Sequence, residues 1–226
     1  MKLLIGVPTT DFVHVEFLKS LTGLIQRLKD EGTNFELMIE SGTLVYLARE
    51  RIAHKAINEH FTHVLWLDSD MVFSPDLLED LMFSGKPFVS GVYQARRKGY
   101  ASVIFTKLEI GEIDGVAHFE RCETYPKETF EIAGCGFGCV LIETSILEDV
   151  CNNKGTCFNP TPNFGEDLAF CKRATELGQR IYCEPSVVCG HIGHIAIYPE
   201  DYERWKDTIS NYNHAKEGLT DNVCKA

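Results

Sequence analysis

The alternation of short apolar runs with stretches of helical periodicity over the first 85 residues constrains the fold more than any other feature. The runs at 3–7, 35–39 and 63–67 have the length of buried strands. Between them, apolar residues recur three and four positions apart over 13–28 and 44–57, which is typical of helices that cover one face of a sheet. This order predicts parallel βαβ units, in which ligands bind at the carboxyl ends of the strands.

The pattern changes between residues 86 and 141, where short β-like runs alternate with charged and glycine-containing turns. We therefore expect an antiparallel or mixed half. A loop over about 151–165 is long enough to be a lid, and periodicity predicts a helix over 166–177. A strand pair around 181–188 and a polar helix near 201–213 complete the chain. Dividing 226 residues by about 150 per domain favours one large domain.

The net charge of −11, from 22 Lys and Arg against 33 Asp and Glu, excludes non-specific binding to a phosphate backbone. A polyanionic ligand would need a local basic cluster or a metal ion.

No apolar run approaches 18 residues and Met1–Pro8 is too short for a signal peptide, so we expect a cytoplasmic protein without a transmembrane segment. The nine cysteines are then expected to be reduced thiols. A zinc site at Cys183, Cys189, His191 and His194 is disfavoured because CxxC pairs are lacking.

An apolar strand at His63–Leu67 ends abruptly in Asp68-Ser69-Asp70. If the chain stays extended there, the two carboxylates point into the same site. They would repel each other unless a divalent cation neutralised them, and their oxygens suit Mg²⁺ or Mn²⁺. A polar turn after the strand is the alternative explanation.

Three further segments carry chemistry-bearing side chains. Glu166 and Asp167 begin the helix after the expected lid, where one could act as a general base or both could simply place favourable charge at a helix N-terminus. His191 and His194 are flanked by glycines after a strand, and neutral imidazole is a competent ligand for Mn²⁺. Arg96-Arg97-Lys98 is either a solvated loop or a contact for a phosphate.

In their order and spacing, these segments resemble the small nucleotide-sugar-dependent glycosyltransferases of the GT-A fold, particularly the compact family-2-like enzymes of bacteria and phages. The resemblance covers nearly the whole chain. Val7–Thr10 resembles the opening nucleotide-contact strand, and Leu47–Arg51 the arginine-bearing helix, although the family often has Asn where Glu50 stands. Asp68–Asp70 resembles the DxD metal motif. The later matches are Gly91–Tyr93 with Arg96, the acceptor-side glycine strand Gly136–Ile142, the Glu166-Asp167 pair and the late histidine segment His191–Gly193.

The resemblance implies an α/β GT-A fold, with a Rossmann-like, mostly parallel central sheet flanked by helices and a mixed acceptor-side half. It implies one domain over 1–226, with a nucleotide-binding half at about 1–92 and an acceptor half at about 93–226. Asp70, helped by Asp68 and His191, would hold Mn²⁺ or Mg²⁺ on the diphosphate of a nucleotide sugar, which we expect to be UDP-linked. The residues expected at the nucleotide sugar are Pro8, Thr9, Thr10, Glu40, Arg49, Asp68, Ser69, Asp70, Tyr93 and Arg96.

Asp167, next to Glu166, would take the proton of the acceptor hydroxyl in an inverting transfer, and a retaining outcome stays open. A sugar-phosphate nucleotidylyltransferase is disfavoured because Thr9–Phe12 is unlike the glycine-rich, Arg- and Lys-bearing loop that such an enzyme needs. A non-catalytic nucleotide- or metal-binding module is the other alternative. The acceptor is a glycan, a lipid-linked sugar, a protein or a hydroxylated DNA base, the last disfavoured by the charge of −11. The sequence leaves the oligomeric state open.

Overall fold

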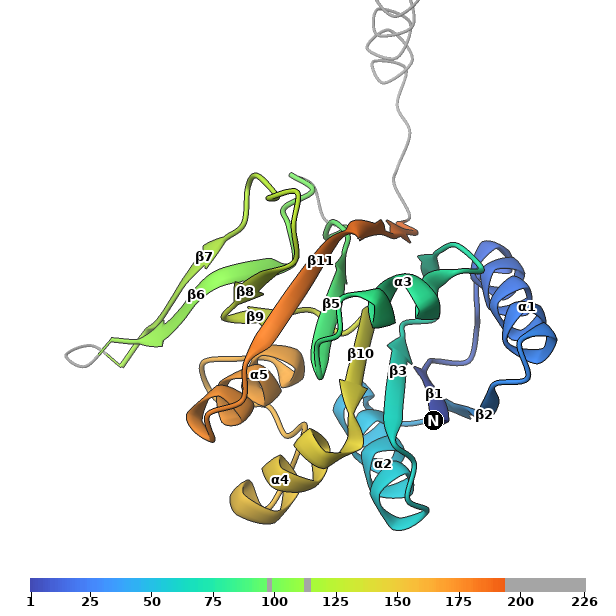
Figure 1. The fold of residues 1–226 in the computed structure, drawn as a ribbon. Coiled ribbons are helices and arrows are strands. Elements are labelled where there is room, and N and C mark those ends of the chain that lie inside the picture. Colours follow the sequence, from blue (N-terminus) through green and yellow to red (C-terminus); the bar gives the residue numbers. More distant parts are fainter. Residues whose placement is uncertain (97–98, 112–114, 194–226) are drawn as a thin grey trace, which may run out of the picture. The chain divides into compact units, whose positions relative to one another are not determined.

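The computed structural model describes residues 1–96, 99–111 and 115–193 (Figure 1). Its helices are α1 (Val15–Asp30), α2 (Val45–Asn58), α3 (Leu77–Phe83), α4 (Thr144–Lys154) and α5 (Glu166–Glu176). Its strands are β1 (Lys2–Pro8), β2 (Asn34–Glu40), β3 (His63–Leu67), β4 (Met71–Val72), β5 (Phe88–Val92), β6 (Ile104–Ile110), β7 (Ala117–Arg121), β8 (Phe130–Ile132), β9 (Gly134–Cys135), β10 (Cys139–Glu143), β11 (Ile181–Val188) and β12 (Gly190–His191). The expected helix near 201–213, as well as Arg97, Lys98 and His194, lies outside the described residues. No helix within the described ranges combines the length and the apolar character needed to cross a membrane.

The central sheet has seven strands in the order β2-β1-β3-β10-β5-β11-β8. β1 pairs in parallel with β2 and with β3, and β5 pairs in parallel with β11. β10 is antiparallel to both of its neighbours, β3 and β5, and β8 is antiparallel to β11. Five strands therefore run one way and two run against them. This arrangement confirms the expected α/β class, with its mostly parallel sheet and its mixed second half.

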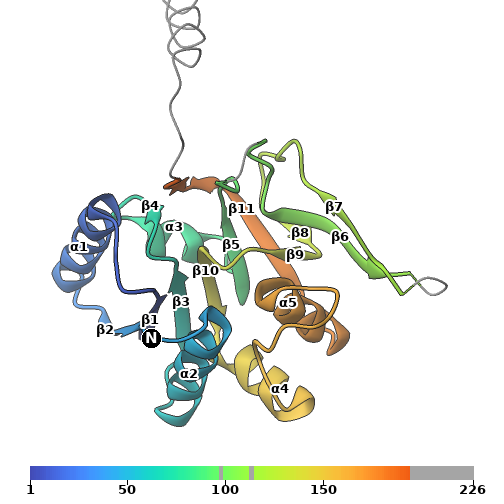
Figure 2. The same ribbon diagram turned by 180° about the vertical axis from the view of Figure 1, so that it is seen from behind.

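Alternate residues of each strand supply two cores, one on each face of the sheet. Leu3 and Ile5 of β1 face the core that includes α1 and α3, whereas Leu4 belongs to the core that includes α2, α4 and α5 (Figures 1 and 2). A Cβ on Gly6 would lie 2.7 Å from Ile52 Cγ2, so the missing side chain lets α2 approach β1. The helical and strand periodicities of the first 85 residues thus correspond to α1, α2 and α3 around β1, β2 and β3.

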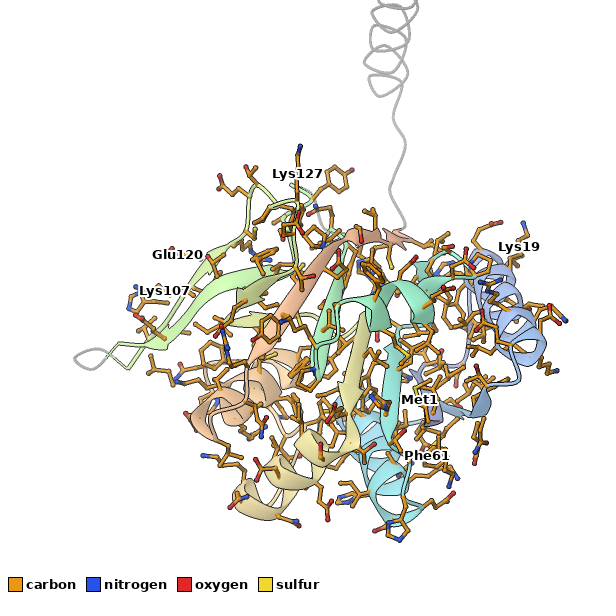
Figure 3. The ribbon with its side chains drawn as sticks, in the orientation of Figure 1. Met1, Lys19, Phe61, Lys107, Glu120 and Lys127 are labelled. Carbon is orange, nitrogen blue, oxygen red and sulfur yellow. A yellow bond between two sulfur atoms is a disulfide. The ribbon has the colours of Figure 1, made fainter. Side chains whose placement is uncertain are left out.

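A second, three-stranded antiparallel sheet contains β7, β6 and β9. Lys107 of β6 lies opposite Glu120 of β7, and Figure 3 shows both side chains on this hairpin, away from Met1 and Phe61 near β1 and β3. The β-like runs expected between residues 86 and 141 therefore contribute strands to two sheets.

Two expectations for the segment after β10 are wrong. The expected loop at 151–165 begins later, because α4 continues to Lys154 and ends at Gly155, whose φ of 71° is in the left-handed region. Cys151 and Cys157 form a disulfide, whereas the sequence predicts reduced thiols; the end of α4 brings their Cα atoms within 4.9 Å. The six other cysteines within the described residues are free and buried.

Candidate active site

The carboxyl ends of β1, β3 and β5 meet the start of β10 at one edge of the central sheet. Because β10 runs antiparallel, Cys139 at its start pairs with Leu67 at the end of β3. The Asp68 N–H donates a hydrogen bond to Gly138 O at 3.2 Å, which ties the segment after β3 to the segment before β10. The edge where ligands bind in such sheets therefore carries both aspartates and Tyr93.

The two aspartates lie in a turn, not in a continuation of β3. The Met71 N–H donates to Asp68 O at 3.2 Å, which closes the turn. The alternative of a polar turn after the strand is therefore confirmed, and the expectation of an extended chain is wrong. Asp68 contacts Arg49, whereas Asp70 contacts a different arginine and a histidine.

Arg49, Asp68, Glu166 and Asp167 form a group of charges that we call the Arg49 cluster. Arg49 lies on α2, and its side chain is 2% exposed. Its Nη2 donates to Asp68 Oδ1 at 2.9 Å, and its Nε lies 3.4 Å from Asp167 Oδ1 and 3.9 Å from Glu166 Oε1. Burial alone would lower the pKa of Arg49, but the three carboxylates raise it. A guanidinium this deeply buried requires such partners, and it fixes their positions in turn.

Asp167 has the surroundings of a proton acceptor. Its Oδ2 accepts a hydrogen bond from the Phe137 N–H at 3.2 Å, while Oδ1 is buried without a hydrogen-bond partner among the described residues. Burial raises the pKa of Asp167 to about 7; Glu166 and Asp68 also raise it, and Arg49 and the Phe137 N–H partly offset them. A carboxyl group with a pKa near 7 can exchange protons efficiently at neutral pH.

Asp70, His191 and Arg96 form a second group, which we call the Asp70 centre. β12 pairs with β4, so that His191 lies opposite Met71, next to Asp70. His191 Nδ1 hydrogen-bonds to Gln94 O at 2.9 Å, which turns Nε2 toward Asp70 Oδ2 at 3.5 Å. Arg96 contacts the same oxygen. The hydrogen bond to Asp70 raises the pKa of His191. Burial would raise the pKa of Asp70, but His191 and Arg96 lower it.

The glycines before β10 make room for Tyr93. The Gly138 N–H donates to the Tyr93 hydroxyl oxygen at 2.9 Å. A Cβ on Gly136 or Gly138 would lie 2.4 or 2.9 Å from that oxygen, so a side chain at either position would displace Tyr93. The Tyr93 ring in turn packs edge-on against His191, with centroids 5.4 Å apart. These glycines therefore allow the close contact with Tyr93, and Tyr93 in turn supports His191.

The residues at the ends of β1 and β2 that are expected to bind the nucleotide lie beside the turn that carries Asp68 and Asp70. Pro8 is the last residue of β1, and the Thr9 N–H donates to Glu40 O at 2.9 Å. The Glu40 carboxylate pairs with an arginine of α2, and Thr10 is exposed. Ser69 accepts, through its backbone oxygen, a hydrogen bond from the segment before α1. The structure thus brings these residues to the same edge as the two aspartates.

No protein-family model matches the sequence. Solved structures nevertheless share its architecture. A197 from STIV has a TM-score of 0.53 at 20% sequence identity, covering 85% of this chain and 86% of that one. GalNAc-T7 with UDP, GalNAc and Mn²⁺ has a TM-score of 0.51 at 12% identity, covering 86% of this chain and 44% of that one. The catalytic domain of Drosophila β1,4-galactosyltransferase 7 in complex with xylobiose has a TM-score of 0.51 at 14% identity, covering 82% of this chain and 66% of that one.

The chain has the GT-A fold. GalNAc-T7 and β1,4-galactosyltransferase 7 are glycosyltransferases with this fold, and the likeness spans most of this chain. This chain spans less than half of the GalNAc-T7 structure and about two thirds of the galactosyltransferase. Identities of 20% or less establish the architecture alone. The expected GT-A fold is therefore confirmed, whereas the bacterial and phage family, the donor and the metal stay predictions.

At this edge of the central sheet, the potential ligand atoms of the Asp70 centre fit a divalent cation. Asp70 Oδ2 and His191 Nε2 lie 3.5 Å apart, and the second ring nitrogen is held by a backbone carbonyl, as is common for metal-binding imidazoles. Among the described residues, no group of three His, Cys, Asp or Glu side chains could hold a metal ion. Mg²⁺ sites commonly combine one or two carboxylates with water and substrate phosphates, so a set of two protein ligands is compatible with such an ion.

Sequence reasoning missed two residues that organise the edge of this GT-A sheet. Glu50, recognised only as a departure from the family pattern, accepts hydrogen bonds from the Cys157 N–H at 3.0 Å and the Phe158 N–H at 2.7 Å. The feature of the sequence that could have revealed Glu50 is a carboxylate next to Arg49, at a position where the family often has an amide. Gln94 orients His191 through a backbone oxygen, which leaves no signal because every residue type carries one.

The loop before α5 is anchored in the protein, contrary to the expectation of a lid. Glu50 holds its first residues, and Arg173 of α5 donates to Cys157 O at 2.9 Å. Phe158 and Phe164, near its two ends, are buried in the core. The loop therefore fixes the start of α5, and with it the carboxylates of the Arg49 cluster.

Proposed function

We propose that this chain is a metal-dependent glycosyltransferase that moves a sugar from a UDP-linked nucleotide sugar to an acceptor hydroxyl. The observation that carries the proposal is the meeting, at one edge of a GT-A sheet, of Asp70 with His191 and of Asp68 with the Arg49–Asp167 ion pair. These side chains come from four separate segments of the chain. Burying a guanidinium is costly and three partly exposed carboxylates around it repel one another, so stability alone is a poor reason for the arrangement.

The donor would lie over the ends of β1, β2 and β3. Asp70 and His191 would hold Mn²⁺ or Mg²⁺, which supplies positive charge to the diphosphate as it leaves. Asp68, which Arg49 holds in place, would contact the donor from the same turn. The other residues proposed to bind the nucleotide sugar are Pro8, Thr9, Thr10, Glu40, Ser69, Tyr93 and Arg96.

Asp167 is the proposed base. The bond between the sugar carbon and the diphosphate oxygen breaks while the acceptor oxygen bonds to the same carbon, and the acceptor proton passes to Asp167. Attack from the face opposite the diphosphate inverts the configuration. A pKa of about 7 suits this role at neutral pH. Arg49, at 2% exposure, acts by positioning Asp68 and Asp167, and Glu166 adds a negative charge that raises the pKa of Asp167.

Within this proposal, the nucleotide occupies the half at about 1–92 and the acceptor occupies the half that begins near 93. The acceptor carries a free hydroxyl, as in a glycan, a lipid-linked sugar, a protein or a hydroxylated base. The likeness in sequence to compact family-2-like enzymes of bacteria and phages supports a short, single GT-A domain as the catalytic unit.

Thermal unfolding with nucleoside diphosphates tests the donor site. UDP with Mn²⁺ is expected to stabilise the protein by about 2.7 kcal/mol at 100 times its Kd, and UDP without metal by much less. A panel of UDP-sugars, incubated with and without Mn²⁺, then tests for release of UDP. Absence of stabilisation by every nucleoside diphosphate tested would overturn the proposal. Binding without release of UDP from any donor would indicate a non-catalytic nucleotide-binding module.

A further inference from the structure

Arg96 neutralises Asp70 from an exposed position. It lies in a hairpin closed by the Gln94–Ser102 bridge and by a hydrogen bond from the Ala95 N–H to the Ala101 oxygen at 2.9 Å. Its guanidinium contacts Asp70 Oδ2, and its side chain is 52% exposed, against 13% for Asp70. The arginine therefore reaches from the solvent side onto a largely covered carboxylate.

The backbone of Arg96 is held close to the strand that carries His191. A Cβ on Gly193 would lie 3.1 Å from Arg96 Cβ and 3.4 Å from its carbonyl oxygen, so glycine at position 193 permits this approach. The preceding segment is fixed as well, because the Ile192 N–H donates to Asp70 O at 2.8 Å. The Arg96 backbone and Cβ are therefore fixed at the edge, while its side chain is half exposed to solvent.

Arg96 contacts the Asp70 oxygen that a metal ion would use. The oxygen that it contacts, Asp70 Oδ2, is the one that faces His191 Nε2 at 3.5 Å. A divalent cation and a guanidinium on one carboxylate oxygen would repel each other strongly in this partly covered site. Metal binding therefore requires Arg96 to leave Asp70, and its charge then needs another anion.

We infer that Arg96 is an exchangeable counter-ion, which neutralises Asp70 in the free protein and moves to the donor diphosphate when metal and donor bind. The inference rests on the proposed function and assigns this arginine a positioning role. A guanidinium matches the paired oxygens of a phosphate, and the backbone contacts of Arg96 keep it beside Asp70. Its consequence is thermodynamic coupling: metal alone competes with Arg96, whereas metal and UDP together relieve that competition.

The test measures Mn²⁺ and UDP binding separately, with no need for turnover. Free Mn²⁺ is followed by electron paramagnetic resonance, and UDP binding at saturating Mn²⁺ by calorimetry, for wild type and Arg96→Met. The variant removes the charge and keeps the aliphatic stem. We expect Mn²⁺ alone to bind at least about fivefold more tightly to Arg96→Met, and UDP with Mn²⁺ at least about fivefold more weakly.

Arg180→Met is the matched control, because Arg180 is also exposed and also pairs with a carboxylate, Glu131, on the strand pair β8 and β11. It is expected to leave both affinities unchanged. If Arg96→Met changes neither affinity, or tightens Mn²⁺ binding without weakening UDP binding, the exchange is overturned. If wild type binds no UDP even with Mn²⁺, the proposed function itself fails, which the same measurements distinguish.

Discussion

Arg49 and Arg96 each pair with one aspartate of the turn after β3, yet their surroundings are opposite. Arg49 is 2% exposed, and carboxylates from the turn and from α5 surround it. Arg96 is 52% exposed and reaches Asp70 from solvent. A buried cation without its partners is costly, whereas an exposed pair contributes little and exchanges readily. Two aspartates separated by one residue therefore have different partners. Asp68 pairs with a cation that is fixed by burial, and Asp70 pairs with one that can be exchanged.

The largest effect is expected from Asp167→Asn, which tests the chemical role of the Arg49 cluster. Loss of a general base should slow sugar transfer by about 10²- to 10⁴-fold while UDP binding with Mn²⁺ stays near wild type. Steady-state kinetics and calorimetry measure the two quantities. Glu166→Gln, one residue earlier on α5, is the control and should be milder. Near-normal transfer by Asp167→Asn, or a product that retains the donor's anomeric configuration, would remove Asp167 from the base role.

Arg49→Met tests whether the buried cation supports the fold. The change leaves Asp68, Glu166 and Asp167 without their counter-charge, so we expect the free energy of unfolding in urea to fall by about 3–5 kcal/mol. Arg51→Met, on the same helix, is the control; Arg51 is 58% exposed in its pair with Glu40, and its loss should cost about 1 kcal/mol or less. Equal losses for the two variants would contradict the distinction between fixed and exchangeable cations.

Asp70→Asn tests the exchangeable side of the comparison. Removing the charged oxygen while keeping the size should weaken UDP-sugar binding in Mn²⁺ at least about tenfold, with little change when metal is absent. Calorimetry with and without Mn²⁺ gives both numbers. His191→Ala should lower the same metal-dependent affinity. Equal affinity of wild type and Asp70→Asn in Mn²⁺ would show that the ion is held elsewhere.

The pH dependence separates the two groups further. Asp167 must be ionised to accept a proton, so the transfer rate should rise with pH up to about 7 and fall about tenfold per unit below its pKa. A cation bound at Asp70 favours the ionised form of Asp167 and should move the inflection of the rate profile to lower pH.

The stability of the protein should also depend on pH through Asp167. The pKa of Asp167 in the folded protein lies above the usual value of 3.8, so the stability that the protonated group contributes is lost as the pH rises through about 7. Asp167→Asn should therefore gain stability relative to wild type between pH 5 and pH 8; a constant difference would contradict the raised pKa.

The smallest effect is expected for the stability of Arg96→Met. Arg96 is half exposed in its pair with Asp70, so the loss of the pair should change the free energy of unfolding by about 1 kcal/mol or less, measured in urea beside Arg49→Met. A loss as large as that of Arg49→Met would mean that Arg96 is a fixed structural cation, and the contrast between the two arginines would disappear.

The elements of the first half could be predicted because their signal is local. Residues 3–7 and 64–67 are apolar throughout, and 13–28 is apolar on one face only, so the pattern of burial can be read from the local sequence. The start of α5 at Glu166 was expected from the same periodicity. α4 was missed because its apolar face is short and a cysteine-, Asn- and Gly-containing stretch follows it directly.

At the site, the order of motifs predicted that Asp70 and His191 would lie together, and β12 brings them together by pairing with β4. The separation of Asp68 from Asp70 could not be predicted, because it depends on a turn closed by one backbone hydrogen bond and on an arginine 19 residues earlier. The contact of the glycines at 136 and 138 with Tyr93 could not be predicted either, because Tyr93 follows β5, more than 40 residues earlier in the chain.

The sequence by itself determined the strand and helix order of the first half, the acidic charge and which side chains are candidates for the site. Each of these follows from residue type and local spacing. Only the tertiary structure decided which cation each aspartate contacts, that Cys151 meets Cys157 and that Glu50 anchors the loop before α5. These pairings join residues far apart along the chain or depend on where a helix ends. The packing of helices and strands decides these pairings. A buried guanidinium such as Arg49 must keep the carboxylates around it, whereas an exposed one such as Arg96 can exchange its partner at little cost.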